Sequence, residues 1–175
     1  MKKILLKWGF SKKGVLRNTK GEWFLFTQLL IILLHFLPAY PKTDIITFPT
    51  NIFFNIIGIL ISIHGLKISF VAFLDLGDNL TPLPFPMEEG VLIKSNSYRN
   101  SRHPLYKGLL FISLGIFIFL SSLLHLALFI SLAFVLRIKA LKEEERLIVK
   151  FPEYKTYMKE VPAIFKNIKY LDWRS

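Results

Sequence analysis

The residue types best suited to chemistry gather between Tyr98 and Gly108, where Arg102 and His103 directly precede Pro104. A proline suits the first position of a helix, because the N–H that it lacks would have no acceptor there. The pattern therefore predicts a helix beginning at Pro104. Its free N–H groups and positive dipole end can bind an anion, such as the carboxylate of an amino-acid-like cofactor. A helix start capped by His103, with Arg102 against phosphate headgroups, explains the same residues without catalysis.

Two adjacent acidic residues, Glu143 and Glu144, come soon after the last apolar stretch of the chain. A carboxylate can accept the hydroxyls of a ribose or offset a cationic centre. Because the last two apolar stretches are expected to form a hairpin, these carboxylates should lie near His103, and at most one or two acids can point into a shared pocket. The alternative is a solvated helix end in which Lys139 pairs with Glu143.

Two tyrosines, Tyr154 and Tyr157, are three residues apart and therefore share one face of a short predicted helix. Such a pair can form an aromatic wall for a flat base. It can equally seat the chain at a membrane interface, where tyrosine is enriched. The local sequence leaves both interpretations open.

Long apolar stretches must position these residues. Hydrophobic residues make up 53% of the 175-residue chain, and Phe occurs 17 times. A soluble domain of this size has too little interior for so many apolar side chains. The composition therefore predicts a single integral membrane domain, an all-helical bundle with about four transmembrane helices and a C-terminal cytoplasmic helical tail. The expected spans cover residues 23–38, 51–74, 104–120 and 123–141.

Basic residues indicate the expected orientation. They concentrate in residues 1–22, in Lys94–Arg102 and in the 142–175 tail, whereas the 39–50 connection carries one. The positive-inside rule then places both termini and the 75–103 loop in the cytoplasm. We expect the 1–22 segment to lie on the membrane surface and the proline-rich 75–103 loop to serve as a lid or binding loop.

Several function classes are disfavoured by composition and spacing. The chain has 23 Lys and Arg residues against 12 Asp and Glu, but the cations flank the apolar stretches, which indicates anionic headgroups rather than a nucleic acid. There is no cysteine, so disulfides, thiolate nucleophiles and Cys-ligated metals are excluded. No spacing among the four histidines suggests a metal site. Glycine-rich nucleotide loops are also absent, so any nucleotide-like cofactor must be held in another way.

Ionisable residues within the apolar stretches are functional candidates by default. His64 and Lys67 lie in the second half of the second stretch, and His35, His125 and Lys107 lie near the ends of the others. Lys67 and Lys107 can alternatively extend their ammonium groups to the cytoplasmic surface.

The order of these motifs resembles the isoprenylcysteine carboxyl methyltransferase family, which is related to the phospholipid N-methyltransferases. The matching segments are Leu76–Pro82, Arg102–Gly108, Glu143-Glu144, Phe151–Tyr157 and Val161-Pro162. The family often has Arg after the Val-Pro pair, where this chain has Ala163, and commonly has Gly where this chain has Asn96.

This resemblance implies a membrane enzyme that uses S-adenosylmethionine, with the cofactor pocket at the cytoplasmic end of the last two spans. The residues that it implies for the pocket are Arg102, His103, Pro104, Tyr106, Gly108, Glu143 or Glu144, and Tyr154 with Tyr157 to close it. Its methyl acceptor would be lipophilic and would enter sideways from the membrane lipids. The sequence does not identify this acceptor: a prenylated cysteine carboxylate, an aminophospholipid and a small lipophilic metabolite all stay open.

The sequence also predicts roles for the catalytic candidates Arg102, His103 and Glu144. A carboxylate acceptor is already ionised and needs no general base, whereas an amine or phenol needs one, for which His103 is the natural candidate. Two other functions stay open at this point. One is a membrane reductase that uses NADPH, because some sterol reductases share the hairpin architecture. The other is a non-catalytic membrane protein, which the departure at Ala163 favours.

Overall fold

The computed structural model describes residues 8, 10–41, 52–87 and 89–174, and within them the chain is helical and contains no strand. The helices are α2 (Lys12–Arg17), α3 (Glu22–Leu34), α4 (Ile52–Leu76), α5 (Pro104–Leu120), α6 (Leu123–Lys150) and α7 (Tyr154–Glu160). Two 3₁₀ turns, Gly77–Asn79 and Asn96–Arg99, lie in the loop between α4 and α5. The prediction of an all-helical chain is therefore confirmed for the described residues.

The helix ends follow local sequence signals. Helix α5 begins at Pro104 as predicted and ends where Ser121 adopts a left-handed conformation, with φ of 46°. Helix α6 begins two residues later, so the predicted tight hairpin is confirmed. Helix α6 continues through the charged residues to Lys150, because the Lys, Glu and Leu residues of that stretch are good helix formers. Most of the predicted 39–50 connection lies outside the described residues.

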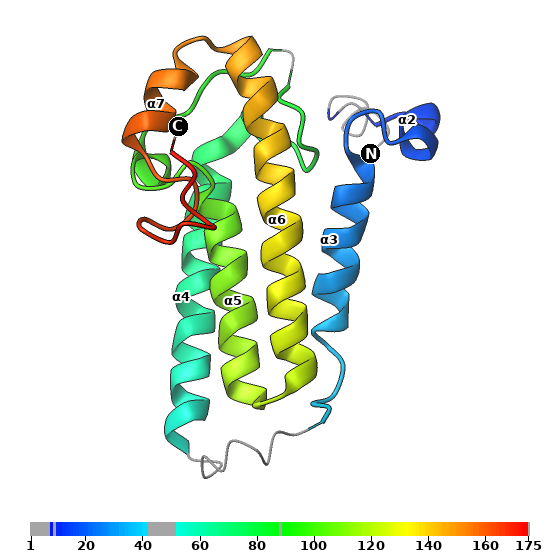
Figure 1. The fold of residues 1–175 in the computed structure, drawn as a ribbon, viewed down its shortest axis with the longest axis vertical. Coiled ribbons are helices and arrows are strands. Elements are labelled where there is room, and N and C mark those ends of the chain that lie inside the picture. The colour runs from blue at the N-terminus through cyan, green and yellow to red at the C-terminus, as the bar shows by residue number, and fades with distance from the viewer. Residues whose placement is uncertain (1–7, 9, 42–51, 88, 175) are drawn as a thin grey trace.

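The longer helices form a bundle. Figure 1 shows α4, α5 and α6 side by side, with α3 packed along α6. At the lower end, the chain after α3 is tied to the α5–α6 hairpin. The Ser122 hydroxyl accepts a hydrogen bond from the Tyr40 N–H at 2.9 Å and donates one to the Tyr40 carbonyl at 3.1 Å. Helices α2 and α7 both lie at the upper end (Figure 1).

Small residues bring α4 and α5 into close contact. Gly58 and Gly65 of α4 face Gly115 and Gly108 of α5. A Cβ atom added to Gly65 would lie 2.6 Å from the carbonyl oxygen of Gly108, and one added to Gly58 would lie 2.7 Å from that of Gly115. These separations are too short for any side chain, so the close approach of the two helices requires glycine.

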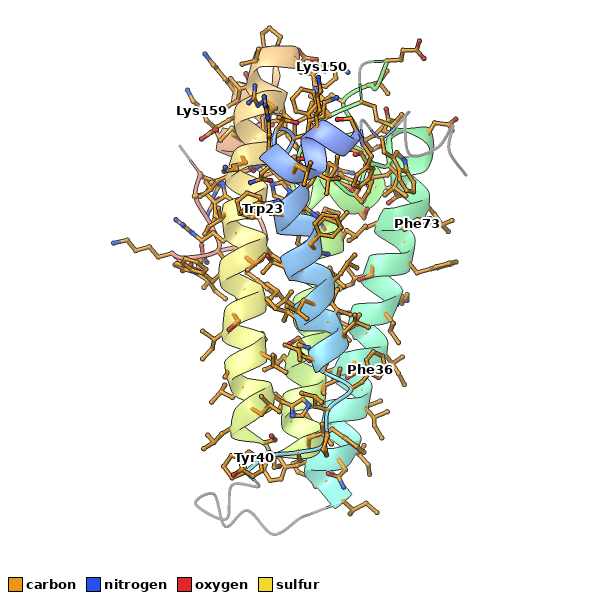
Figure 2. The ribbon with its side chains drawn as sticks, turned by 90° about the vertical axis from the view of Figure 1, so that its right-hand side faces the viewer. Trp23, Phe36, Tyr40, Phe73, Lys150 and Lys159 are labelled. Atoms are coloured by element: carbon orange, nitrogen blue, oxygen red, sulfur yellow. The ribbon has the colours of Figure 1, made fainter. Side chains whose placement is uncertain are left out.

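The outer surface of the bundle is apolar along much of its length. Phe36 is 85% exposed, Trp23 56% and Phe73 48%, and Figure 2 shows them spaced along the bundle. Helices α4 and α6 are long and apolar enough to cross a membrane. At 1.5 Å per residue, α3 and α5 are about 20 and 26 Å long, short of a hydrocarbon core of about 30 Å. Of the four predicted spans, α4 and α6 are therefore long and apolar enough to cross a membrane, whereas α3 and α5 are shorter.

Candidate active site

One end of the bundle collects the residues that the sequence singles out. The start of α5, the end of α6, helix α7 and the segment after α7 meet there (Figure 1). Backbone hydrogen bonds join two of these segments, because the N–H of Arg102 donates to the Pro162 carbonyl and that of His103 to the Ala163 carbonyl, both at 2.9 Å. The Ser101 hydroxyl also donates to the Ala163 carbonyl, at 2.9 Å. The chain before α5 is therefore fixed against the Val-Pro segment.

Arg102 and Glu144 form a buried ion pair with two contacts. Arg102 Nε lies 2.7 Å from Glu144 Oε1, and Nη2 lies 3.2 Å from Oε2. The remaining N–H groups of the guanidinium donate to the carbonyls of Met158 at 2.8 Å, Val161 at 2.6 Å and Trp173 at 3.2 Å. All the N–H donors of a guanidinium are used in this arrangement. Arg102 consequently ties α6 to α7 and to the C-terminal segment.

Glu144 accepts further hydrogen bonds besides those from Arg102. Its Oε1 receives bonds from His103 Nε2 at 2.8 Å and from the Tyr154 hydroxyl at 3.2 Å. Its Oε2 receives a bond from Trp173 Nε1 at 2.6 Å. A carboxylate has about four lone-pair sites, so these donors together leave it no capacity for a ligand. Donors on both oxygens also stabilise the ionised form of this buried carboxylate.

His103 is oriented by Glu144 and by a neighbouring ring. It stacks on Tyr106 with the rings parallel to within 2° and their centroids 5.2 Å apart. The bond from Nε2 to the Glu144 carboxylate requires a proton on Nε2, which in the neutral imidazole leaves Nδ1 as an acceptor. Nδ1 lies 3.9 Å from Glu143 Oε2. In its neutral form the His103 imidazole is therefore a proton acceptor at Nδ1, with its tautomer set by a buried carboxylate.

Glu143 differs from its neighbour Glu144 in having acceptor capacity to spare. The Tyr106 hydroxyl donates to Glu143 Oε2 at 2.9 Å. Within the described residues no other hydrogen bond engages this carboxylate, and its side chain is 27% exposed. Glu143 is therefore the acidic residue of the pair that can still bind a ligand group.

A cavity of about 230 Å³ opens beside these residues, and His103, Tyr106 and Glu143 form part of its polar wall. A smaller chamber of about 70 Å³ shares Tyr98, Arg102 and Glu143 with it. The apolar residues that line the larger chamber include Leu25, Phe73, Leu76, Leu80 and Leu105. Together the two chambers approach the lower end of the usual range of ligand pockets, roughly 300–1,000 Å³.

Lys139 adds a buried cation to the wall of the larger chamber. It is 3% exposed, and its Nζ donates to Gln28 Oε1 of α3 at 2.8 Å. The same nitrogen lies 5.3 Å from the centre of the Tyr106 ring. Among the described residues no carboxylate lies within ion-pair distance of this ammonium group. A buried cation whose partners are neutral is well suited to an anionic group of a ligand.

Three tyrosines line the smaller chamber: Tyr98, Tyr154 and Tyr157. The rings of Tyr154 and Tyr157 meet edge to face with centroids 5.5 Å apart, and the Tyr157 hydroxyl donates to the Tyr98 carbonyl. Burial raises the pKa of all three hydroxyls, and the charge of a nearby carboxylate, Glu143 or Glu144, raises those of Tyr98 and Tyr154 further. The chamber is therefore walled by neutral aromatic rings at physiological pH.

The structure brings most of the sequence-predicted residues to this one place. Those that gather around the two chambers or the buried ion pair are Arg102, His103, Tyr106, Glu143, Glu144, Tyr154 and Tyr157. Two others lie elsewhere. Pro104 lines a separate cavity between α4 and α5, and Gly108 packs against Ser69 of α4. Pro104 thus starts the helix without facing the chambers, and Gly108 serves the helix packing.

Some residues of the site carried no recognisable motif. Trp173 reaches Glu144 from the C-terminal segment, and its one sequence signal is a lone tryptophan in a basic tail. Gln28 reaches Lys139 from α3, and its signal is a single amide within an apolar stretch. Both contacts join segments that are far apart in the chain, which local spacing does not predict.

A family model described as phospholipid methyltransferase matches residues 53–153, more than half of the chain. The chain belongs to the phospholipid methyltransferase family. The matched region holds nearly all of α4, together with α5 and α6, and therefore Arg102, His103, Glu143 and Glu144. No individually curated protein matches the chain. Family membership indicates a membrane methyltransferase that acts on lipid-like substrates, which confirms the resemblance at the level of the wider family.

Proposed function

We propose that this family member is a membrane-embedded methyltransferase that uses S-adenosylmethionine and resembles the isoprenylcysteine carboxyl methyltransferases in its site. The observation that carries the proposal is the position of His103, held by Glu144 and Arg102, at the wall of a two-chambered cavity. These three residues and the cavity lie largely within the region that the family model matches.

The residues around the cavity fit the chemical groups of S-adenosylmethionine. The amides of Leu105 and Tyr106, in the first turn of α5, have no acceptor within the helix and are suited to a carboxylate. Glu143 has acceptor capacity for ribose hydroxyls or for a cationic group. Tyr98 and its neighbours in the smaller chamber suit a flat adenine ring. When bound, the cofactor supplies a methyl group on a cationic sulfur.

We assign different roles to the two acidic residues of α6. Glu144 has no free acceptor site, so its role is to hold Arg102 and to fix the tautomer of His103. Glu143 lines both chambers and is the carboxylate that contacts the ligand. The sequence-based hypothesis that Glu144 touches the cofactor is thereby refined to a positioning role.

His103 supplies the proton acceptor that some methyl acceptors require. For an amine or a phenol, Nδ1 takes the proton that the nucleophile loses as its bond to the methyl group forms. A carboxylate acceptor is ionised already, and for it the protein contributes alignment and exclusion of water. Burial of His103, at 5% exposure, is consistent with a site closed to bulk solvent.

The larger chamber supports a lipophilic acceptor. Leu25, Phe73 and Leu105 give it apolar walls, and Lys139 provides one buried cation. This combination suits a molecule with a hydrocarbon body and an anionic group close to the reacting atom. A phospholipid and a prenylated cysteine both have this character.

The proposed orientation in the membrane has about four spans, with α3 and α5 extended by their flanking residues. Figure 2 shows Lys150 and Lys159 at the end of the bundle that holds the site, and Tyr40 at the opposite end. The gathering of cations at the site end supports a cytoplasmic location for the active site and for both termini.

Methyl transfer with labelled S-adenosylmethionine tests this proposal. The purified full chain would be supplied in lipid vesicles with a farnesylated cysteine peptide or with phosphatidylethanolamine. We expect label in at least one acceptor. His103→Gln should lower turnover of the amine acceptor by roughly 10²–10⁴-fold and should spare a carboxylate acceptor.

A Lys155→Ala variant is the control, because Lys155 is exposed and lines neither chamber. The proposal fails if a folded sample transfers no label to either acceptor. It also fails if His103→Gln and Glu143→Gln both keep the full rate with the amine acceptor.

A further inference from the structure

A separate cavity of about 290 Å³ lies on the outer side of the α4–α5 pair. It shares no lining residue with either chamber of the candidate active site. Its lining residues are His64, Lys67, Ile68, Val71, Ser97, Asn100, Ser101, Pro104 and Lys107. Nothing in the proposed methyl transfer uses this cavity.

Cationic and polar side chains gather at one part of this cavity. Lys67 of α4, Lys107 of α5, His64 and Asn100 are among its lining residues. Within the described residues these four side chains form no hydrogen bond or ion pair. The Lys107 ammonium lies 5.2 Å from the centre of the Phe165 ring, and the His64 ring meets the Phe111 ring edge to face with centroids 5.3 Å apart. Two cations and two further polar groups that make no hydrogen bond within the described residues are suited to the oxygens of a phosphate.

The other polar groups of the cavity are already engaged. The Ser97 hydroxyl donates to the Asp75 carboxylate, and the Ser101 hydroxyl donates to the Ala163 carbonyl. The Asp75 carboxylate is itself matched by the Ser97 N–H at 3.0 Å and by Asn96 at 3.1 Å. The two lysines outnumber this one carboxylate, so the net charge of the residues around the cavity is positive.

The remaining wall is apolar and faces outward. Ile68 directly follows Lys67 on α4, and Val71 lies one helical turn beyond Lys67 and is 39% exposed. Lys67 lies nine residues before the end of α4 at Leu76, which is about 13 Å along the helix axis. A phospholipid bound here would place its phosphate beside the lysines and its acyl chains along the part of α4 that precedes Lys67, where Leu60 and Ile63 are exposed.

We propose that this cavity, defined by Lys67, Lys107, His64 and Asn100, binds the phosphate of a membrane phospholipid that is not the methyl acceptor. The lipid is a ligand of the outer face, because the cavity is closed off from the chambers by the chain between Ser97 and Pro104. Neighbouring residues of that chain face opposite ways. Ser97 and Ser101 line the lipid cavity, whereas Tyr98 and Arg102 line the active-site chambers. A bound lipid therefore contacts the back of the active-site wall.

Native mass spectrometry of the detergent-purified full chain tests this site. The probes are phosphatidylglycerol, a diacylglycerol with the same acyl chains, and inorganic phosphate. We expect retention of phosphatidylglycerol alone. The double variant Lys67→Ala/Lys107→Ala should weaken its binding by about thirtyfold, since each lysine contributes about a factor of five to six near an anionic lipid.

The matched control is Lys94→Ala/Lys155→Ala, which removes two exposed lysines that line none of these cavities. It should bind phosphatidylglycerol as the wild type does. A second variant, Val71→Trp, fills the apolar wall without changing charge and should also block the lipid. Unchanged melting temperatures would show that all variants are folded.

If both double variants lost phosphatidylglycerol binding equally, the lipid would be held by general charge attraction and the proposed site would be wrong. Equal binding of the diacylglycerol would show an apolar groove without phosphate recognition, and displacement by inorganic phosphate would show a free-anion site. Each of these results contradicts the proposal. None depends on methyl transfer, so the site and the proposed function are tested separately.

Discussion

The Glu144→Gln variant keeps the size of the side chain but removes the charge that Arg102 and His103 contact. Arg102 is 3% exposed, and its carbonyl partners at Met158, Val161 and Trp173 carry no net charge. Breaking a buried ion pair by neutralising one member typically costs about 3–5 kcal/mol. The new amide also places N–H groups against N–H donors, which adds to the cost.

We therefore expect Glu144→Gln to lower the melting temperature by about 10 °C. This follows from a shift of about 2–4 °C per kcal/mol in a protein of 150–250 residues. Thermal melting in detergent, followed by tryptophan fluorescence, measures it directly, because Trp173 is itself bonded to Glu144.

The matched variant is Glu143→Gln, one residue away on the same helix. Glu143 makes one hydrogen bond and is partly exposed, so its loss should cost less than about 1 kcal/mol. It should instead weaken binding of the methyl donor. The assignment of roles would be refuted if Glu144→Gln had the melting temperature of the wild type but no longer bound the methyl donor.

Three further predictions concern other parts of the fold. Gly65→Ala should destabilise the bundle by about 1–3 kcal/mol, because its Cβ meets the Gly108 carbonyl, whereas Leu66→Ala on the exposed face should have little effect in the same melting assay. Trp173→Phe should cost about 1–3 kcal/mol by removing an N–H donor from the buried Glu144 carboxylate, and a melt equal to that of the wild type would contradict the network. The raised pKa values of Tyr98, Tyr154 and Tyr157 stabilise the fold fully below the unfolded tyrosine pKa of about 10 and progressively less above it, so melting temperature should fall above about pH 10. A melting temperature that stays constant up to about pH 11 would show that these hydroxyls ionise as easily in the folded as in the unfolded protein.

The elements that position the site could be predicted because their signals are local. Pro104 marks the start of α5, and the Ser121-Ser122 pair marks the reversal before α6. A tight hairpin brings the start of one helix beside the end of the next. The proximity of His103 to the two acidic residues follows from that hairpin alone.

The division of roles between Glu143 and Glu144 could not be predicted from the sequence. Consecutive residues of a helix point to different faces, and the phase of α6 is set by its packing against α3 and α5. The contacts of Glu144 with Trp173, and of Lys139 with Gln28, also join distant segments. Such contacts depend on the tertiary fold, so no local spacing reveals them.

In the proposed mechanism the two-chambered cavity binds S-adenosylmethionine. Calorimetry of the purified full chain against S-adenosylhomocysteine, with NADPH as the competing ligand, tests it most directly. We predict binding of S-adenosylhomocysteine, weaker binding by Glu143→Gln, unchanged binding by Lys155→Ala, and no binding of NADPH. Preferential binding of NADPH, or binding of neither ligand by a folded sample, would contradict the account.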